Sequence, residues 1–269
     1  MGRTRSAFRS STCAATVRAD PVERLSREGT LLLGGAYAIL LQVADPTIGA
    51  VVSAHSNFAN RTVDRLHNTL TFVYGVMLGT PAEAEIVAKV TARVHSRIPG
   101  ANDPDRQLWV AATLYGTAVQ VYERVHGPLA PVDAEAVLAS YARLGTSLEV
   151  PAASWPSSTT EFAAYWASTV SSLKVGPHAK RVAHDLFHPT NPPLWLRALL
   201  PLASLLTASL LEPPLRAAYG MPWSRARERR AGAAWAVIRA LTRVLPQRVV
   251  TAPSRRYLAR VRAMVNRVS

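Results

Sequence analysis

The stretch RTVDRLHNTLTFVYGVMLGTPAEAEIVAKVTARVHSRI, residues 61–98, decides the fold class. On both sides of one break its apolar side chains recur every three or four residues, the period of an amphipathic helix. The break is Thr80-Pro81-x-Glu83, which combines an N-cap residue, a proline at the first helical position and a capping glutamate. The stretch therefore predicts two helices joined by a very short connection.

The same spacing continues along the chain, and Asp103-Pro104 and Ser158-x-x-Glu161 mark further helix starts. Alternating strand patterns and turn pairs of the Asn-Gly type are absent from the sequence. We expect an all-α protein, a single multi-helix domain. The expected helices span residues 22–42, 46–55, 61–78, 81–98, 104–125, 132–148, 159–173, 178–187, 194–211, 225–244 and 254–267.

The composition allows one large core, because 49% of the 269 residues are hydrophobic. The net charge of +14 is concentrated near one end: residues 213–269 hold thirteen arginines and a single acid, Glu228. Such a segment is either a solvated basic face or a contact for an anionic neighbour. Because no base-stacking aromatic ladder or nucleic-acid motif accompanies the arginines, we expect no nucleic acid and leave a peripheral membrane contact open.

Cys13, the single cysteine, excludes an intrachain disulfide and fits a reducing compartment. The segment before residue 20 has no apolar run of secretory length. Two apolar segments, 29–44 and 194–211, are each interrupted by polar residues or proline, and we interpret both as core helices. These features predict a cytoplasmic protein without signal peptide or transmembrane helix, or one peripheral to the inner membrane.

His95 is the main candidate for chemistry. In the helix 81–98 a core stripe is expected, and His95 lies on its flank in line with small residues that would let a flat ligand approach. The predicted core stripe is Val87, Val90, Val94 and Ile98, and the small residues are Ala84, Ala88 and Thr91. A proximal histidine is the common way to hold haem iron, whereas a lone histidine is more often a half-buried packing residue.

In the preceding helix Arg65 and Thr69 continue into Phe72 and Val76, so the arginine is expected to point along a buried or cleft-facing surface. It is expected to point away from a polar strip formed by Asp64, Asn68 and Gly75. A buried arginine needs an anionic or hydrogen-bonding partner. A haem propionate or oxygen species could be that partner, and so could an acid such as Asp45 or Glu123; the residues alone leave both open.

The other histidines are weaker candidates. His184-x-x-x-His188 has helical ligand spacing without an evident third ligand, and His55 and His126 are expected to act as helix caps. Phosphate loops, nucleophile elbows and dinucleotide-binding fingerprints are absent from the sequence, which argues against most hydrolases, kinases and dehydrogenases.

A series of short motifs resembles the rubber oxygenase (latex-clearing protein) and MpaB-type haem oxygenase superfamily, which is found widely in actinobacteria. The motifs, in chain order, are Arg27-Glu28-Gly29, Leu32-Leu33-Gly34-Gly35, Leu40-Leu41-Gln42-Val43-Ala44-Asp45-Pro46, His55-Ser56-Asn57-Phe58, Arg65-Leu66-His67-Asn68-Thr69, Gly79-Thr80-Pro81, Val94-His95, Asp103-Pro104, Leu108-Trp109-Val110-Ala111-Ala112-Thr113-Leu114, Tyr122-Glu123, Gly127-Pro128-Leu129 and Ala218-Tyr219-Gly220-Met221-Pro222-Trp223.

The resemblance implies a globin-related helical core that holds haem b, with His95 as the axial iron ligand and Arg65 and Thr69 as the distal polar pair. It also implies dioxygen and a hydrophobic or lipid-like substrate. The implied organisation is a disordered basic lead-in over residues 1–21, an MpaB/rubber oxygenase-like catalytic domain over 22–250 and a basic C-terminal helix over 251–269.

The chain departs from the family pattern at two places. Members commonly have His-Pro where this chain has Asp45-Pro46, and often Trp-Val-His where it has Trp109-Val110-Ala111. Rubber-cleaving members also use an acidic base upstream of the arginine that this sequence does not match, which argues against polyisoprene as the substrate.

The leading hypothesis is therefore a haem-dependent oxygenase that oxidises or cleaves a hydrophobic substrate. The alternative is a non-catalytic helical protein that docks on anionic membranes through its arginine-rich C-terminal region.

Overall fold

The computed structural model describes residues 20–55, 58–190 and 192–268, and all regular structure in these ranges is helical. The prediction of an all-α single domain is confirmed. Its elements are α1 (Pro21–Ser26), η1 (Gly29–Gly34), α2 (Gly35–Val43), α3 (Pro46–His55), α4 (Phe58–Leu78), α5 (Pro81–His95), α6 (Pro104–His126), α7 (Pro131–Thr146), η2 (Ala152–Ser154), α8 (Thr159–Ser172), α9 (Pro177–Phe187), α10 (Leu194–Leu210), α11 (Pro213–Ala218), α12 (Arg225–Val244), α13 (Gln247–Val250) and α14 (Ala252–Val268). Of the predicted lead-in over residues 1–21, residues 1–19, with Cys13, lie outside the described residues, whereas Asp20 caps α1 and Pro21 begins it.

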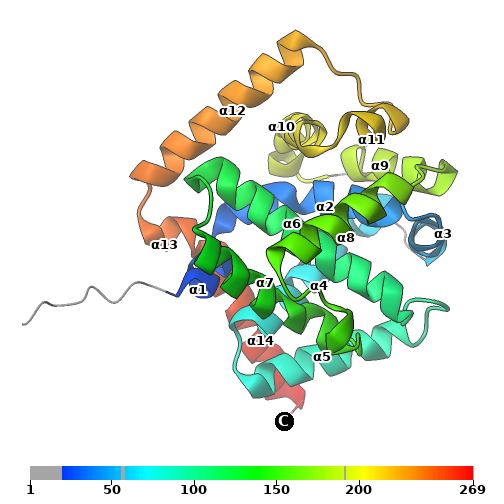
Figure 1. Ribbon diagram of the computed structural model, residues 1–269, viewed down its shortest axis with the longest axis vertical. Helices are drawn as coiled ribbons and strands as arrows, with labels where there is room; N and C mark the ends of the chain where they lie inside the picture. The colour runs from blue at the N-terminus through cyan, green and yellow to red at the C-terminus, as the bar shows by residue number, and fades with distance from the viewer. Residues whose placement is uncertain (1–19, 56–57, 191, 269) are drawn as a thin grey trace, which may run out of the picture.

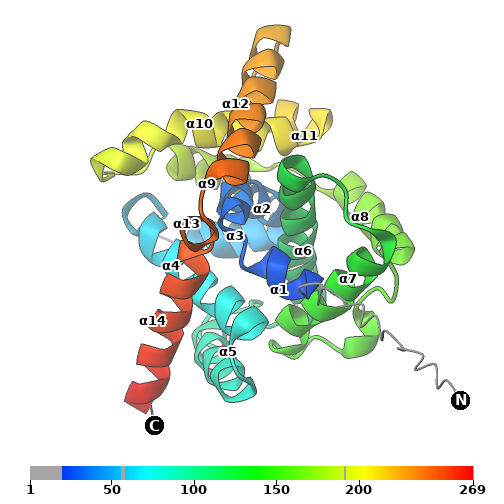
Figure 2. The ribbon, with the colours of Figure 1, turned by 90° about the vertical axis from the view of Figure 1, so that its left-hand side faces the viewer.

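Helix α6 forms the centre of the molecule, with η1, α2, α7 and α12 packed around it (Figures 1 and 2). Most of its apolar side chains are buried, and Ala112 and Val121 are fully so. The hairpin of α4 and α5 lies at one end of the molecule, where α14 runs alongside both helices (Figure 2). One continuous core therefore connects the central helix to the hairpin.

The predicted helix starts are confirmed. Thr80 Oγ1 accepts a hydrogen bond from the Glu83 amide (3.2 Å) while the Glu83 carboxylate accepts one from the Thr80 amide (2.8 Å), which completes the capping box. Asp103 caps α6 through the amide of Arg106 (3.1 Å). Local side-chain chemistry thus sets where these helices begin.

The predicted helix over 22–42 is wrong as a single element, because the chain breaks at Glu28. The Glu28 carboxylate accepts hydrogen bonds from the Thr30 amide and hydroxyl, and it caps η1. A Cβ atom on Gly29 would lie 2.4 Å from the Val250 carbonyl oxygen, so the backbone of α13 occupies the space that a side chain would need. Helices α11 and α13 were not predicted, and α5 ends at His95, three residues before its predicted end.

The interpretation of the two apolar segments as core helices is correct for residues 29–44 but only for the C-terminal half of residues 194–211. Residues of α2 are buried, and so is the C-terminal half of α10, including Leu206 and Leu210. The first two turns of α10 are exposed, and its Leu194 and Trp195 face solvent. Among the described residues no single helix is long and apolar enough to cross a membrane; one pair, Gly29–Val43 with Pro46–Ala54, meets the criterion jointly but bends by 108°.

Candidate active site

The candidate site lies on the α4–α5 hairpin, whose two helices are joined by Gly79 and Thr80 alone. The helices approach closely at Gly75, where an added Cβ would lie 2.8 Å from Val87 Cγ2. The assignment of Gly75 to a polar strip is therefore wrong: the glycine is buried between α5 and α14, and its missing side chain permits the contact. The hairpin brings the N-terminal half of α4 beside the C-terminal end of α5.

His95 is the last residue of α5 and is half-buried. Its Nδ1 lies 2.9 Å from Gln107 Nε2, and the same amide nitrogen donates to the Ala101 carbonyl at 2.6 Å. Since the Gln107 nitrogen is a donor, Nδ1 accepts, and the neutral ring carries its proton on Nε2. Burial, together with the positive charge of Arg65, lowers the pKa of His95 below its ordinary value and so favours the neutral imidazole.

Arg65 is also half-buried, and burial lowers the pKa of its guanidinium. Its positive charge contributes to the lowered pKa of His95, so the guanidinium lies within electrostatic range of the imidazole. The stripe that continues from Arg65 ends in the buried side chains of Phe72 and Val76, in agreement with the predicted direction. Thr69, one turn after Arg65, is exposed.

Both helices of the hairpin present apolar side chains to solvent next to these residues. Leu66 follows Arg65 and Val94 precedes His95, and both are exposed, as is Val90 one turn earlier on α5. The predicted core stripe of α5 is therefore wrong at Val90 and Val94, and only Val87 is fully buried. The stripe in line with His95, formed by Ala84, Ala88 and Thr91, is half-buried instead. An apolar ligand could cover the exposed side chains.

The two acids considered as partners of Arg65 have other roles. Asp45 caps α3 through the amides of Thr47 (2.9 Å) and Ile48 (2.8 Å), and Glu123 accepts a hydrogen bond from the Leu129 amide (3.2 Å). Both carboxylates thus stabilise local backbone turns.

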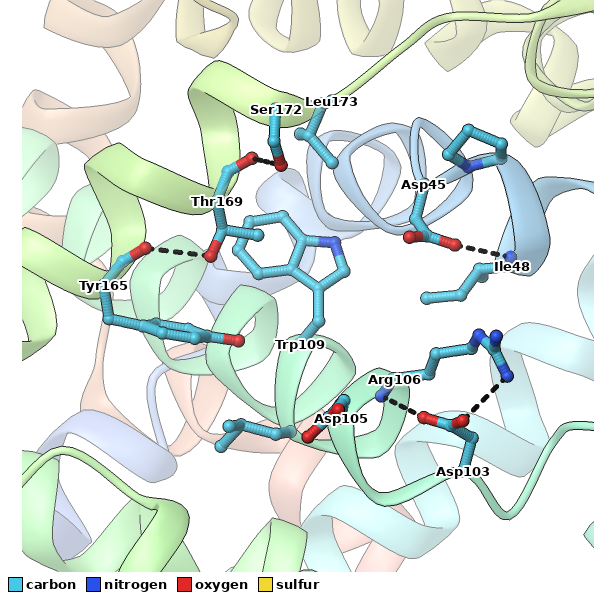
Figure 3. A pocket seen from close by; sticks show the side chains of 12 residues that line it. Asp45, Ile48, Asp103, Asp105, Arg106, Trp109, Tyr165, Thr169, Ser172 and Leu173 are labelled. Atoms are coloured by element: carbon cyan, nitrogen blue, oxygen red, sulfur yellow. Dashed lines mark hydrogen bonds and ion pairs between the residues drawn. The ribbon is translucent and has the colours of Figure 1, made fainter.

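A separate pocket of about 410 Å³ opens where the starts of α3 and α6 meet the end of α8 (Figure 3). Several of its polar groups make local contacts: Arg106 pairs with Asp103 at 3.0 Å, and the Thr169 hydroxyl donates to the Tyr165 carbonyl. Trp109 forms part of the wall and donates to the Leu41 carbonyl. Gln107, which holds His95, comes from the same first turns of α6.

Four other histidines have structural partners: His67, His126, His184 and His188. His126 lies 3.0 Å from a Glu28 carboxylate oxygen at the end of α6, so it joins two segments in addition to its predicted position at a helix end. The rings of His184 and His188 stack, and the described residues contain no group of three or more potential metal-ligating His, Cys, Asp or Glu side chains. His67 Nδ1 lies 2.7 Å from the Tyr257 hydroxyl, while the side chain of His55 lies outside the described part.

Gln107 was not among the predicted site residues. Its side chain is fully buried and holds the imidazole of His95. A signal was present, because Gln107 is the polar member of an otherwise apolar stripe with Ala111, Leu114 and Ala118 on α6. A buried amide at such a position requires hydrogen-bond partners.

Comparison with known proteins gives a family assignment. A family model for the catalytic domain of the ER-bound oxygenase mpaB/B' and rubber oxygenase matches residues 22–245. Two uncharacterized proteins, Mb2261 of Mycobacterium bovis and Rv2237 of Mycobacterium tuberculosis, are each 30% identical to this chain over 232 residues, which cover 79% of this chain and 89% of each relative. No solved structure matches the chain.

Proposed function

Because this chain belongs to the mpaB/rubber oxygenase family, and is thus related to oxygenases, we propose that it is a haem b-dependent enzyme. It would activate dioxygen at an iron held by His95 and oxidise or cleave a hydrophobic substrate. The observation that carries the proposal is that a half-buried histidine, hydrogen-bonded to Gln107, ends α5 while a half-buried arginine lies on the neighbouring helix α4. Each of these two residues occupies a position that the family resemblance assigns to the cofactor.

The residues fit haem in three respects. A metal-binding imidazole must be neutral, and burial with the nearby Arg65 charge favours that form of His95. Metal-bound histidines usually have their second ring nitrogen fixed by a hydrogen bond, which Gln107 supplies. In the structure the Gln107 nitrogen faces Nδ1, so binding of iron at Nε2 would require the amide to turn its oxygen toward Nδ1–H and give up its bond to the Ala101 carbonyl.

The third respect is the surface around the site. Leu66, Val90 and Val94 are exposed on the two helices that carry Arg65 and His95. Bound haem supplies redox chemistry with dioxygen and a large apolar surface that would cover such side chains. From the family membership we also infer that the helical core is globin-related and that the catalytic domain extends over residues 22–250.

Each residue of this chain then has a role. His95 holds the cofactor, and Arg65 neutralises a carboxylate of the cofactor or donates hydrogen bonds to dioxygen. Thr69, exposed one turn away, supplies a second donor. Phe72 and Val76 are buried, and with Leu114 they form apolar walls that exclude water and favour a hydrophobic substrate.

Absorption spectroscopy tests the proposal. The purified protein, as isolated or after addition of haem, should show a Soret band that is lost or shifted in His95→Ala. His184→Ala serves as the matched control, because His184 is exposed and far along the chain on α9, and its spectrum should equal that of the wild type. A wild-type protein that stays colourless after addition of haem would contradict the proposal.

A further inference from the structure

Helix α12 lies on the outside of the molecule, and only one of its sides packs against α6 and α10 (Figures 1 and 2). The inner side includes Ala231 and Trp235, which are buried, and Trp235 Nε1 donates to Ser209 Oγ at 3.1 Å. Arg239 also fixes the helix, since its guanidinium donates to the Arg124 carbonyl at 2.9 Å. The orientation of α12 about its own axis is therefore set by these contacts.

The outer side of α12 is apolar where a surface helix is normally polar. Val237, Leu241 and Val244 follow one another at helical spacing, and they are 58%, 49% and 76% exposed. Leu245 and Val249 extend the exposed apolar residues past the end of the helix. Scattered surface apolar residues are ordinary, but an aligned row of them marks a contact surface.

Arginines border this row. Arg230 lies about two turns ahead of Val237 on the same side, and Arg225, Arg229 and Arg243 are exposed along one flank. The one acid of α12 is Glu228, which falls on the side opposite Val237 at about 100° per residue. The outer face of α12 thus combines a row of apolar side chains with a positively charged border.

The charge identifies the partner. A second copy of this chain placed on the same face would bring the arginines of two molecules together, which is repulsive. A nucleic acid would match the charge but not the apolar row, because the aromatic residue of α12, Trp235, is buried and cannot stack on bases. An anionic bilayer matches both features, since arginines contact headgroup phosphates while apolar side chains enter the acyl boundary.

We propose that the outer face of α12 docks the protein on the surface of an anionic phospholipid bilayer. The helix lies in the plane of the interface, with Val237, Leu241 and Val244 facing the lipid and the arginines in the headgroup layer. This inference is independent of the proposed haem chemistry.

Sedimentation of the full chain with phospholipid vesicles tests the docking surface. The wild type should bind vesicles of phosphatidylcholine with phosphatidylglycerol and be released by added salt, because salt screens the attraction. Each arginine contributes roughly fivefold to affinity for an anionic surface, so Arg229→Gln with Arg243→Gln should weaken binding about 25-fold. Leu241→Asp should abolish sedimentation, while Val132→Asp, at a 71% exposed valine on α7, should bind like the wild type.

A second readout locates the contact. In Val244→Trp the new indole should shift its fluorescence to the blue on addition of the anionic vesicles, as expected for insertion at the acyl boundary. Far-UV circular dichroism establishes that each variant is folded. The proposal is overturned if Leu241→Asp binds vesicles as well as Val132→Asp does. It is also overturned if the wild type forms a lipid-independent dimer that Leu241→Asp dissociates.

Discussion

The side-chain amide of Gln107 is hydrogen-bonded both to the Ala101 carbonyl and to the His95 ring. Which atom of the amide faces the ring decides which imidazole nitrogen carries the proton, and only the nitrogen without the proton can bind iron. The side chain acts on the ligand and not on iron itself, so Gln107 is a positioning residue. Its spacing in the sequence indicates an inward direction, but its partner His95 lies on another helix, and a single sequence does not reveal that contact.

We predict that Gln107→Leu lowers the affinity for haem by about 10- to 100-fold, the usual effect of removing the partner of a ligating histidine. Gln107→Glu should keep most of that affinity, because its carboxylate accepts a hydrogen bond from Nδ1–H and leaves Nε2 for iron. Titration with haem, followed at the Soret band, measures both variants, and thermal unfolding of the haem-free proteins checks that each is folded. Equal affinities of Gln107→Leu and the wild type would show that the amide does not position His95.

At the scale of the elements, the sequence predicts helix starts well because N-cap residues and prolines act within one turn. The sequence predicts helix breaks and exposed faces less well where they depend on a segment distant in the chain. The break at Glu28 depends on the approach of Val250, and the exposure of the first turns of α10 depends on what packs against them. The spacing of apolar residues predicts α5 correctly as a helix but not which of its sides faces solvent. Val90 and Val94, predicted as core, lie on a face that no other described helix covers fully.

The contact between α4 and α5 gives a prediction with an internal control. Gly75→Ala places a methyl group 2.8 Å from the buried, stiff side chain of Val87, so the free energy of unfolding should fall by about 1–3 kcal/mol. Gly232→Ala, in the exposed middle of α12 with no atom within 4 Å of the added Cβ, should raise it by about 0.5–1 kcal/mol. Urea denaturation followed by circular dichroism measures both.

Adding Val87→Ala to Gly75→Ala separates crowding from other effects. The shorter side chain makes room for the new methyl group. The double variant should therefore lose less free energy of unfolding than the sum of the losses of the two single variants. Strictly additive losses would mean that the two positions do not crowd each other.

At the scale of the whole molecule, Glu28 links the segment between α1 and η1 to the end of the central helix. Its carboxylate accepts hydrogen bonds from Thr30 Oγ1 (2.9 Å) and pairs with His126 Nε2 (3.0 Å). Burial alone would raise the pKa of Glu28, but the hydrogen bonds from His126 and Thr30 together outweigh it and hold the pKa below its ordinary value of 4.5. The unfolded chain therefore binds a proton at Glu28 more readily than the folded chain does.

The sign of the pH effect follows. The ionised carboxylate stabilises the fold above the unfolded pKa of 4.5, and this stabilisation is lost as the pH falls through the lower folded pKa. Between about pH 5 and pH 3 the wild type should lose stability more steeply than Glu28→Gln, which cannot titrate. Urea unfolding at a series of pH values measures the difference, and parallel profiles would rule out Glu28 as the source.

The two-residue connection between α4 and α5 has a consequence for the order of folding. Residues that meet across this hairpin are close in sequence, so joining them costs little loop-closure entropy, and local contacts of this kind form early. The contacts of α14 with the hairpin close a much longer loop and should form late. Pulse-labelling hydrogen exchange should therefore find amides of Val73–Val87 protected before those of Tyr257–Val261, with Arg65 and His95 already on neighbouring helices while the C-terminal segment is still unfolded.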